Sequence, residues 1–179
     1  MLRSNVLRTA FTFVGLSGLA TTTNSNYDGV GPYGGGGFGG SKQAYLYLAS
    51  ELTAMGLTAG TIESISFYLD NNTYPTTLSN YAVEMGTTSA SSTTGGAFFT
   101  GGTNVYNGPF TTVLGWNTHT LSTPFVWDGT SNIFVQLCNG TTGFGSNPPV
   151  RYTATTYSSA VQTSGFQPGG ICAATLGAT

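Results

Sequence analysis

Short runs of alternating apolar and polar residues recur along most of this chain, with turn-forming residues between them. Such runs occupy residues 44–48, 61–69, 80–86, 131–138 and 150–157. A period of two places every second side chain on the same face of a β-strand. Many short strands joined by turns are typical of a sandwich or a jelly roll. The sequence therefore predicts an all-β protein, an antiparallel β-sandwich of the jelly-roll or immunoglobulin-like kind.

Two of these runs indicate which side chains face the core. Each has three apolar residues on one face: Ile65, Phe67 and Leu69 in the first, and Tyr81, Val83 and Met85 in the second. One short helix is predicted over residues 50–57, with Ser50 as its N-cap and Gly56 as its end. Helix content is otherwise expected to be minimal.

The chain divides by composition into three segments. Residues 1–20 are predicted to form a donor-type extension strand, residues 21–43 a glycine-rich linker, and residues 44–179 the sandwich module. Two early arginines and a small-residue end would also suit a signal peptide. Polar residues and glycines interrupt that apolar run, however, and the alternation favours a strand. The side chains on its apolar face are Leu7, Thr9, Phe11 and Phe13.

Charge is scarce in this chain, and that excludes several functions. Charged residues make up 6% of the sequence and the formal net charge is −2. Nucleic-acid binding depends on phosphate neutralisation, so a nucleic-acid partner is not expected. No stretch approaches the roughly 20 apolar residues of a membrane span. Low charge also removes a barrier to self-association, which suits a subunit that polymerises.

No constellation of residues in the sequence points to catalysis, a cofactor or a metal. The six carboxylates are expected in turns, on outward strand faces or in the first helical turn. His119 lies in the middle of a predicted strand, where a histidine is more often a surface residue than a base. The single histidine and two distant cysteines form no metal-ligand cluster. The chain is therefore predicted not to be an enzyme.

Cys138 and Cys172 are the two cysteines of the chain. An even count in a sequence that looks secreted suggests one disulfide, and hence an extracellular or cell-surface location. Two unrelated buried thiols are the alternative.

Trp116 and Trp127 are the candidates for sugar binding, because an indole can stack on a sugar ring. Packing at the core or edge of a sandwich is the competing interpretation, and it is favoured for Trp127, which precedes the turn signal of Asp128 and Gly129.

Several segments between residues 43 and 139 carry a family resemblance. They are QAYLYLASELTAMGLTAGTIESISF (43–67), YAVEMGTTS (81–89), AFFTGG (97–102) and GWNTHTLSTPFVWDGTSNIFVQLC (115–138). This pattern resembles β-sandwich modules of large bacterial surface and secreted proteins of the type IX secretion route. The resemblance implies an adhesion or scaffold domain without a catalytic site.

Such modules continue past the second cysteine into a closing strand, whereas this sequence ends at residue 179. Residues 3–13 (RSNVLRTAFTF) resemble that closing strand. Three explanations are open: the strand completes a neighbouring subunit, it folds back on its own module, or the chain is one period of a tandem array. We expect the first, a head-to-tail filament of identical subunits. The alternative is a monomeric surface adhesion or carbohydrate-binding module, with glycans as partners and the N-terminal strand folded in cis.

Overall fold

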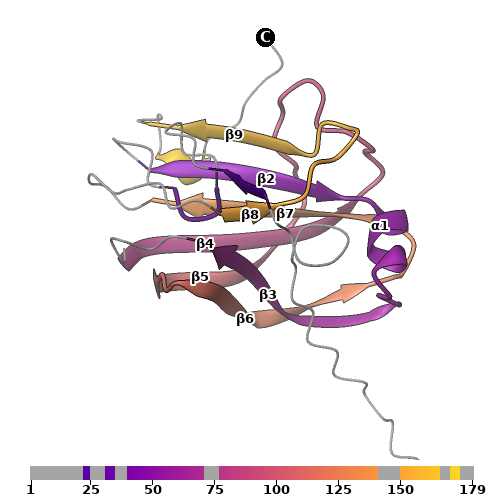
Figure 1. Ribbon diagram of the computed structural model, residues 1–179, viewed down its shortest axis with the longest axis horizontal. Helices are drawn as coiled ribbons and strands as arrows, with labels where there is room; N and C mark the ends of the chain where they lie inside the picture. Colours follow the sequence, from indigo (N-terminus) through magenta and orange to yellow (C-terminus); the bar gives the residue numbers. More distant parts are fainter. Residues whose placement is uncertain are drawn as a thin grey trace, which may run out of the picture.

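The computed structural model describes residues 22–24, 31–34, 40–70, 77–140, 150–165 and 170–173. These residues form two antiparallel sheets that pack face to face (Figure 1). The prediction of an all-β antiparallel sandwich is confirmed.

The larger sheet has five strands in the order β5-β4-β7-β2-β9. Their bounds are Thr103–Thr111 for β5, Thr77–Thr88 for β4, Asn132–Asn139 for β7, Ser41–Tyr47 for β2 and Ala160–Ser164 for β9. β7 lies in the middle, paired along its length with β4 on one side and β2 on the other. In Figure 1, β9 and β2 lie at one end of this sheet and β5 at the other.

The smaller sheet has four strands in the order β1-β8-β3-β6. β3 (Gly60–Leu69) and β6 (Gly115–Trp127) are long and pair along most of their length. β1 (Thr22–Asn24) and β8 (Val150–Tyr152) have three residues each, and within the described residues β8 meets β3 only at the pair Leu69 and Val150. The smaller sheet is therefore essentially a two-stranded ribbon with a short extension. The strand predicted over 150–157 ends at residue 152.

The predicted helix is α1 (Ala49–Ala54), and its N-cap differs from the prediction. Leu48 holds that position, with a backbone N–H that donates to Glu51 Oε2 at 2.9 Å. The prediction of Ser50 was wrong, because this carboxylate caps the helix from within its first turn. The helix ends at Ala54 with Met55 as its C-cap, and Gly56, the predicted stop, follows directly. Gly56 has a φ of +90°, a left-handed conformation that glycine adopts without a steric penalty.

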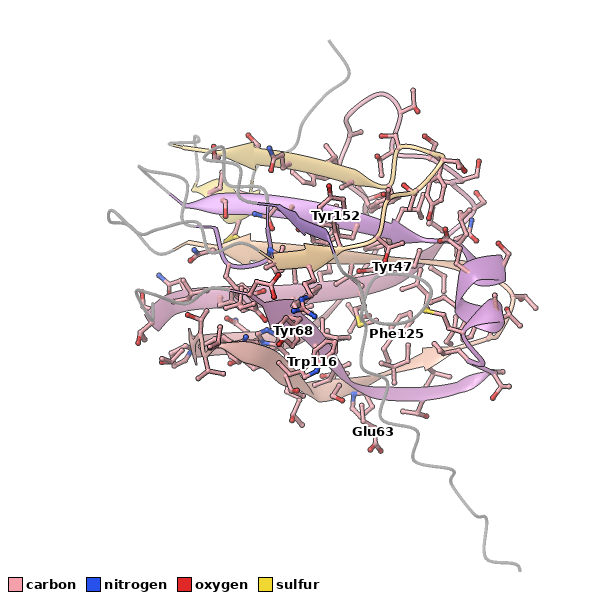
Figure 2. The ribbon with its side chains drawn as sticks, in the orientation of Figure 1. Tyr47, Glu63, Tyr68, Trp116, Phe125 and Tyr152 are labelled. Atoms are coloured by element: carbon pink, nitrogen blue, oxygen red, sulfur yellow. A yellow bond between two sulfur atoms is a disulfide. The ribbon has the colours of Figure 1, made fainter. Side chains whose placement is uncertain are left out.

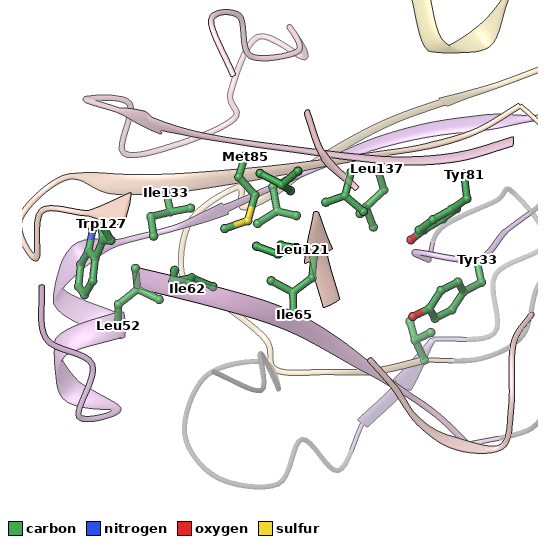
Figure 3. Packing of buried hydrophobic residues seen from close by; sticks show 14 of the residues in the cluster. Tyr33, Leu52, Ile62, Ile65, Tyr81, Met85, Leu121, Trp127, Ile133 and Leu137 are labelled. Atoms are coloured by element: carbon green, nitrogen blue, oxygen red, sulfur yellow. The ribbon is translucent and has the colours of Figure 1, made fainter. Parts of the chain in front are cut away.

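The core lies between the two sheets (Figure 3). Tyr81, Val83 and Met85 on β4 are fully buried, as the alternation predicts. On β3, Ile65 and Leu69 are fully buried, whereas Phe67 between them is only half-buried.

The β7 strand is buried on both faces, because a loop also covers the outer face of the larger sheet. The rings of Phe99 and Phe134 stack with centroids 4.7 Å apart. Gln136 adds two hydrogen bonds to the backbone of Phe99.

Parts of the predicted linker, residues 21–43, belong to the sandwich. β1 lies within this range, β2 begins at Ser41, and Tyr33 is buried in the core. Tyr33 and these strand pairings together tie the described parts of the segment to the fold. The predicted extension strand over residues 1–20, with Leu7, Thr9, Phe11 and Phe13, lies outside the described residues.

Candidate functional site

Among the described residues the two sheets are unequal, and one half of the sandwich is less completely covered than the other. The inner faces of β4 and β7 lie against β3 and β6, and their apolar residues are fully buried. The β2 strand continues the same sheet, yet its aromatic inner-face residues Tyr45 and Tyr47 are only half-buried. We call the part of the sandwich around β2 and β9 the open half, and the part around β4 and β7 the closed half.

The open half ends at the edge of β3. Between Gly60 and Tyr68, β3 pairs with β6 on one side, and no strand among the described residues pairs with it on the other. Phe67 lies near this edge, with its ring centroid 6.3 Å from that of Tyr45 across the two sheets. Both rings point into the sandwich and both remain half-buried. An unpaired strand edge above half-buried aromatic side chains is a template for an added strand.

A second cluster lies on the outer face of the smaller sheet. Trp116 on β6 is 37% exposed and stands edge-on to Tyr68 of β3, with ring centroids 5.1 Å apart (Figure 2). The guanidinium of Arg151 lies over the Tyr68 ring at 4.1 Å, and its Nε donates to Asp70 Oδ1 at 2.7 Å. The cluster thus joins a half-exposed indole to an ion pair whose two charges offset each other.

Trp127 does not join Trp116 in this cluster. Its indole is 1% exposed in the core, and its Nε1 donates to the backbone oxygen of Ser131 at 2.8 Å. A fully buried ring cannot stack on a sugar, so only its packing role stands. Trp127 therefore packs in the core, as the favoured interpretation expects, and Trp116 is the remaining tryptophan candidate for sugar binding.

His119 is not the surface residue that the sequence suggested. Its ring is fully buried among aromatic rings, and its Nε2 lies 2.8 Å from the hydroxyl of Tyr33. The rings of Tyr81 and Phe110 lie at centroid distances of 5.1 and 4.0 Å. Burial lowers the pKa of His119 from 6.5 to about 3. This histidine is therefore neutral at physiological pH and serves as a core residue that anchors Tyr33.

The carboxylates with described partners hold the fold together. Asp128 accepts hydrogen bonds from the backbone of Thr130 and Ser131, and its hydrogen bonds to Ser131 and Thr130 lower its pKa from the ordinary value. Glu84 accepts from Gln136 at 3.2 Å. Asp70 was expected in a plain turn and instead pairs with Arg151.

Cys138 and Cys172 form a disulfide, with Cα atoms 5.4 Å apart. It ties β7 to the short helix η1 (Ile171–Ala173), where Ile171 is buried beside it. The interpretation of two unrelated thiols is thereby excluded. No group of three potential metal ligands occurs within the described ranges.

In the part of the chain that the structure describes, no helix has the length and hydropathy needed to cross a membrane.

The sequence alone could predict only one member of the Trp116 cluster. Trp116 could be named from its type alone, whereas Tyr68, Asp70 and Arg151 join it only through the pairing of β3 with β6 and β8. The alternation of residues along β6 could have indicated that His119 is buried, because His119 lies on the same strand face as the buried Leu121.

Comparison with known proteins assigns no relative to this chain: no family model matches it, and neither the curated proteins nor the solved structures contain a significant match.

Proposed function

We propose that this protein is a structural subunit of an extracellular filament, assembled head to tail when the N-terminal strand of one subunit inserts into the sandwich of the next. The observation that supports it best is the open half, where Tyr45 and Tyr47 are half-buried on β2 although the apolar inner-face residues of the neighbouring strand β7 are fully buried. A subunit that keeps such a surface gains stability when another strand covers it.

The chemistry of the N-terminal segment suits that role. Its predicted apolar face carries Leu7, Phe11 and Phe13. Burying each of these side chains stabilises the contact by roughly 1.5–3 kcal/mol. Main-chain hydrogen bonds along the added strand contribute further. One complementary strand and one acceptor on each molecule generate an open chain of subunits.

Two further properties fit an extracellular polymer of this kind. The Cys138–Cys172 disulfide is typical of an oxidising compartment. The low charge imposes little electrostatic repulsion between identical subunits. No catalytic role is proposed.

Deletion of residues 1–20 tests the proposal. We expect the purified full chain to form filaments in electron micrographs and the truncated chain to sediment as separate subunits. Phe11→Ser should weaken assembly because it changes the predicted apolar face. Thr12→Ser, on the opposite predicted face, is the matched control and should assemble normally. Ordinary filaments from the truncated chain would refute the proposal.

A second candidate function rests on the Trp116 cluster. A surface adhesion or carbohydrate-binding module would stack a sugar ring on the half-exposed indole and bind its hydroxyls through Arg151 and Asp70. Trp116→Ala should then abolish retention on immobilised polysaccharides. Val126→Ala, at a 72% exposed position on the same strand, is the control. Equal retention of both variants and the parent chain would exclude this use of the cluster.

A further inference from the structure

We propose that the acceptor for the inserted strand is the open edge of β3, and that its occupant is residues 3–13 of a second copy of this chain. The inference rests on the proposed filament function and goes one step further, because it places the contact on one of several strand edges in the sandwich.

Two other edges are less suited to receive a strand. The edge on the side of β5 is occupied by β6, where Ser122 Oγ donates to the backbone oxygen of Val105 at 3.1 Å. The start of β9 is covered by the loop at Thr93. The Thr93 Oγ1 donates to the backbone oxygen of Ala160 at 3.1 Å, and its backbone N–H donates to the backbone oxygen of Ser158 at 2.7 Å.

The edge of β3 is long, and aromatic side chains lie beneath it. Its unpaired stretch from Gly60 to Tyr68 covers nine of the ten residues of the strand, and the proposed donor has eleven. Beneath it, Phe67 and Tyr45 face each other, half-buried, from opposite sheets. A strand that pairs with β3 here would lie over β2 and extend the smaller sheet across the open half. Its apolar face would meet these aromatic rings.

Charge is also complementary at this edge. Glu63 lies within the unpaired stretch and has no ion pair among the described residues, and its side chain points away from the ribbon (Figure 2). The donor carries Arg3 and Arg8, two of the four cations of the whole chain, and no acidic residue. An opposite charge is therefore available for Glu63 in the segment that would lie beside it.

Cysteine cross-linking tests the placement. Ala10 lies on the outward face of the predicted donor strand, and Ser64 lies on the outward face predicted for β3. Directly paired strand residues have Cα atoms about 4.5–5.5 Å apart, which a disulfide can bridge. The native cysteines are already bonded to each other, so introduced cysteines are the free thiols of each variant. A second donor variant, Thr12→Cys, covers the case in which the donor strand pairs with β3 in a register shifted by two residues.

The decisive sample is a mixture of two single variants, Ala10→Cys and Ser64→Cys, allowed to assemble and then oxidised. We expect a disulfide-linked dimer on a non-reducing gel, since a bond between two different chains arises only in trans. The double variant should give a ladder of covalent oligomers. Thr163→Cys on β9, paired with Ala10→Cys, is the control and should stay unlinked.

Failure of the placement and failure of the filament are distinguishable. If filaments form and Ala10→Cys or Thr12→Cys links to Thr163→Cys but not to Ser64→Cys, the β3 acceptor is wrong and the filament stands. Filaments in which neither position links overturn the placement as well. If the double variant instead closes an internal disulfide in a monomer and no filaments form, the strand folds in cis and both proposals are wrong.

Discussion

The closed and open halves of the sandwich share one continuous five-stranded sheet but differ in what lies across from it. Over β4 and β7, the long strands β3 and β6 bury every apolar inner-face residue, among them Val83 and Val135. Over β2, Tyr45 and Tyr47 remain half-buried, and within the described residues the strands β8 and β1 of the facing sheet have three residues each. The burial of an inner-face side chain in a sandwich therefore depends on the length of the strands that face it as much as on the alternation within its own strand.

The largest effect is expected from truncating the core of the closed half. Trp127→Ala should lower the free energy of unfolding by about 3–5 kcal/mol, because it removes a buried indole that the surrounding side chains cannot replace. Urea unfolding monitored by circular dichroism measures it. Trp116→Ala, on the same strand but half-exposed, should cost well under half as much. Equal losses for the two tryptophans would contradict the contrast in their burial.

A pH dependence is expected from His119 in the aromatic cluster with Tyr33. The unfolded chain binds a proton on this residue below about pH 6.5. The folded chain holds the ring neutral down to about pH 3, where its lowered pKa lies. The unfolded state therefore binds more protons between these values, and stability should fall by roughly 4–5 kcal/mol as pH drops through that window.

The measurement for His119 is urea unfolding at several pH values, compared between the parent and His119→Phe. Tyr33, Tyr81 and Tyr106 are the titratable groups whose rings lie against His119 among the described residues, and phenols do not titrate in this range. The variant should therefore lose the part of the acid slope that His119 causes. An unchanged slope would show that the carboxylates alone set the acid response.

A smaller effect is expected on the outer cover of the closed half. A Cβ at Gly86 would overlap the ring of Phe134, which is stacked on Phe99. Gly86→Ala should therefore destabilise the fold by about 1–3 kcal/mol through overpacking. Gly108→Ala is the control, because a Cβ at that position would have no neighbouring heavy atom within 4 Å. The melting temperatures of the two variants should separate; if they fall together, contact with Phe134 is not the cause.

The smallest effect on the isolated subunit is expected in the open half. Tyr45→Ala removes a half-buried ring and should cost a truncated chain lacking residues 1–20 only about 1–2 kcal/mol. The same substitution in the full chain should weaken filaments more strongly, because the ring is then expected to be covered by the donor strand. Comparing thermal unfolding of the subunit with filament dissociation in urea measures both. A loss as large as that of Trp127→Ala in the truncated chain would remove the distinction between the halves.

Local sequence predicts which side chains of a strand face the core. It does not predict burial that depends on residues far away in the chain. The inward positions of β4 followed from alternation, since the period of two is a property of the strand itself. His119 was placed on the surface by residue type, although it shares a face with the buried Leu121. The burial of Tyr33 is not predictable from the local sequence, because glycines surround it and its partners come from β4 and β6.

By itself, the sequence determined an all-β antiparallel sandwich, one short helix that ends at a glycine, and a cysteine pair able to form one disulfide. These depend on period, turn chemistry and residue type, which act over a few neighbouring residues. Only the tertiary structure decided that β7 is central, that Trp127 is core and Trp116 is not, and that no described strand pairs with β3 on its second side from Gly60 to Tyr68. Strand order and coverage arise from pairings between segments far apart in the chain, and no local pattern specifies which strand will lie across from which.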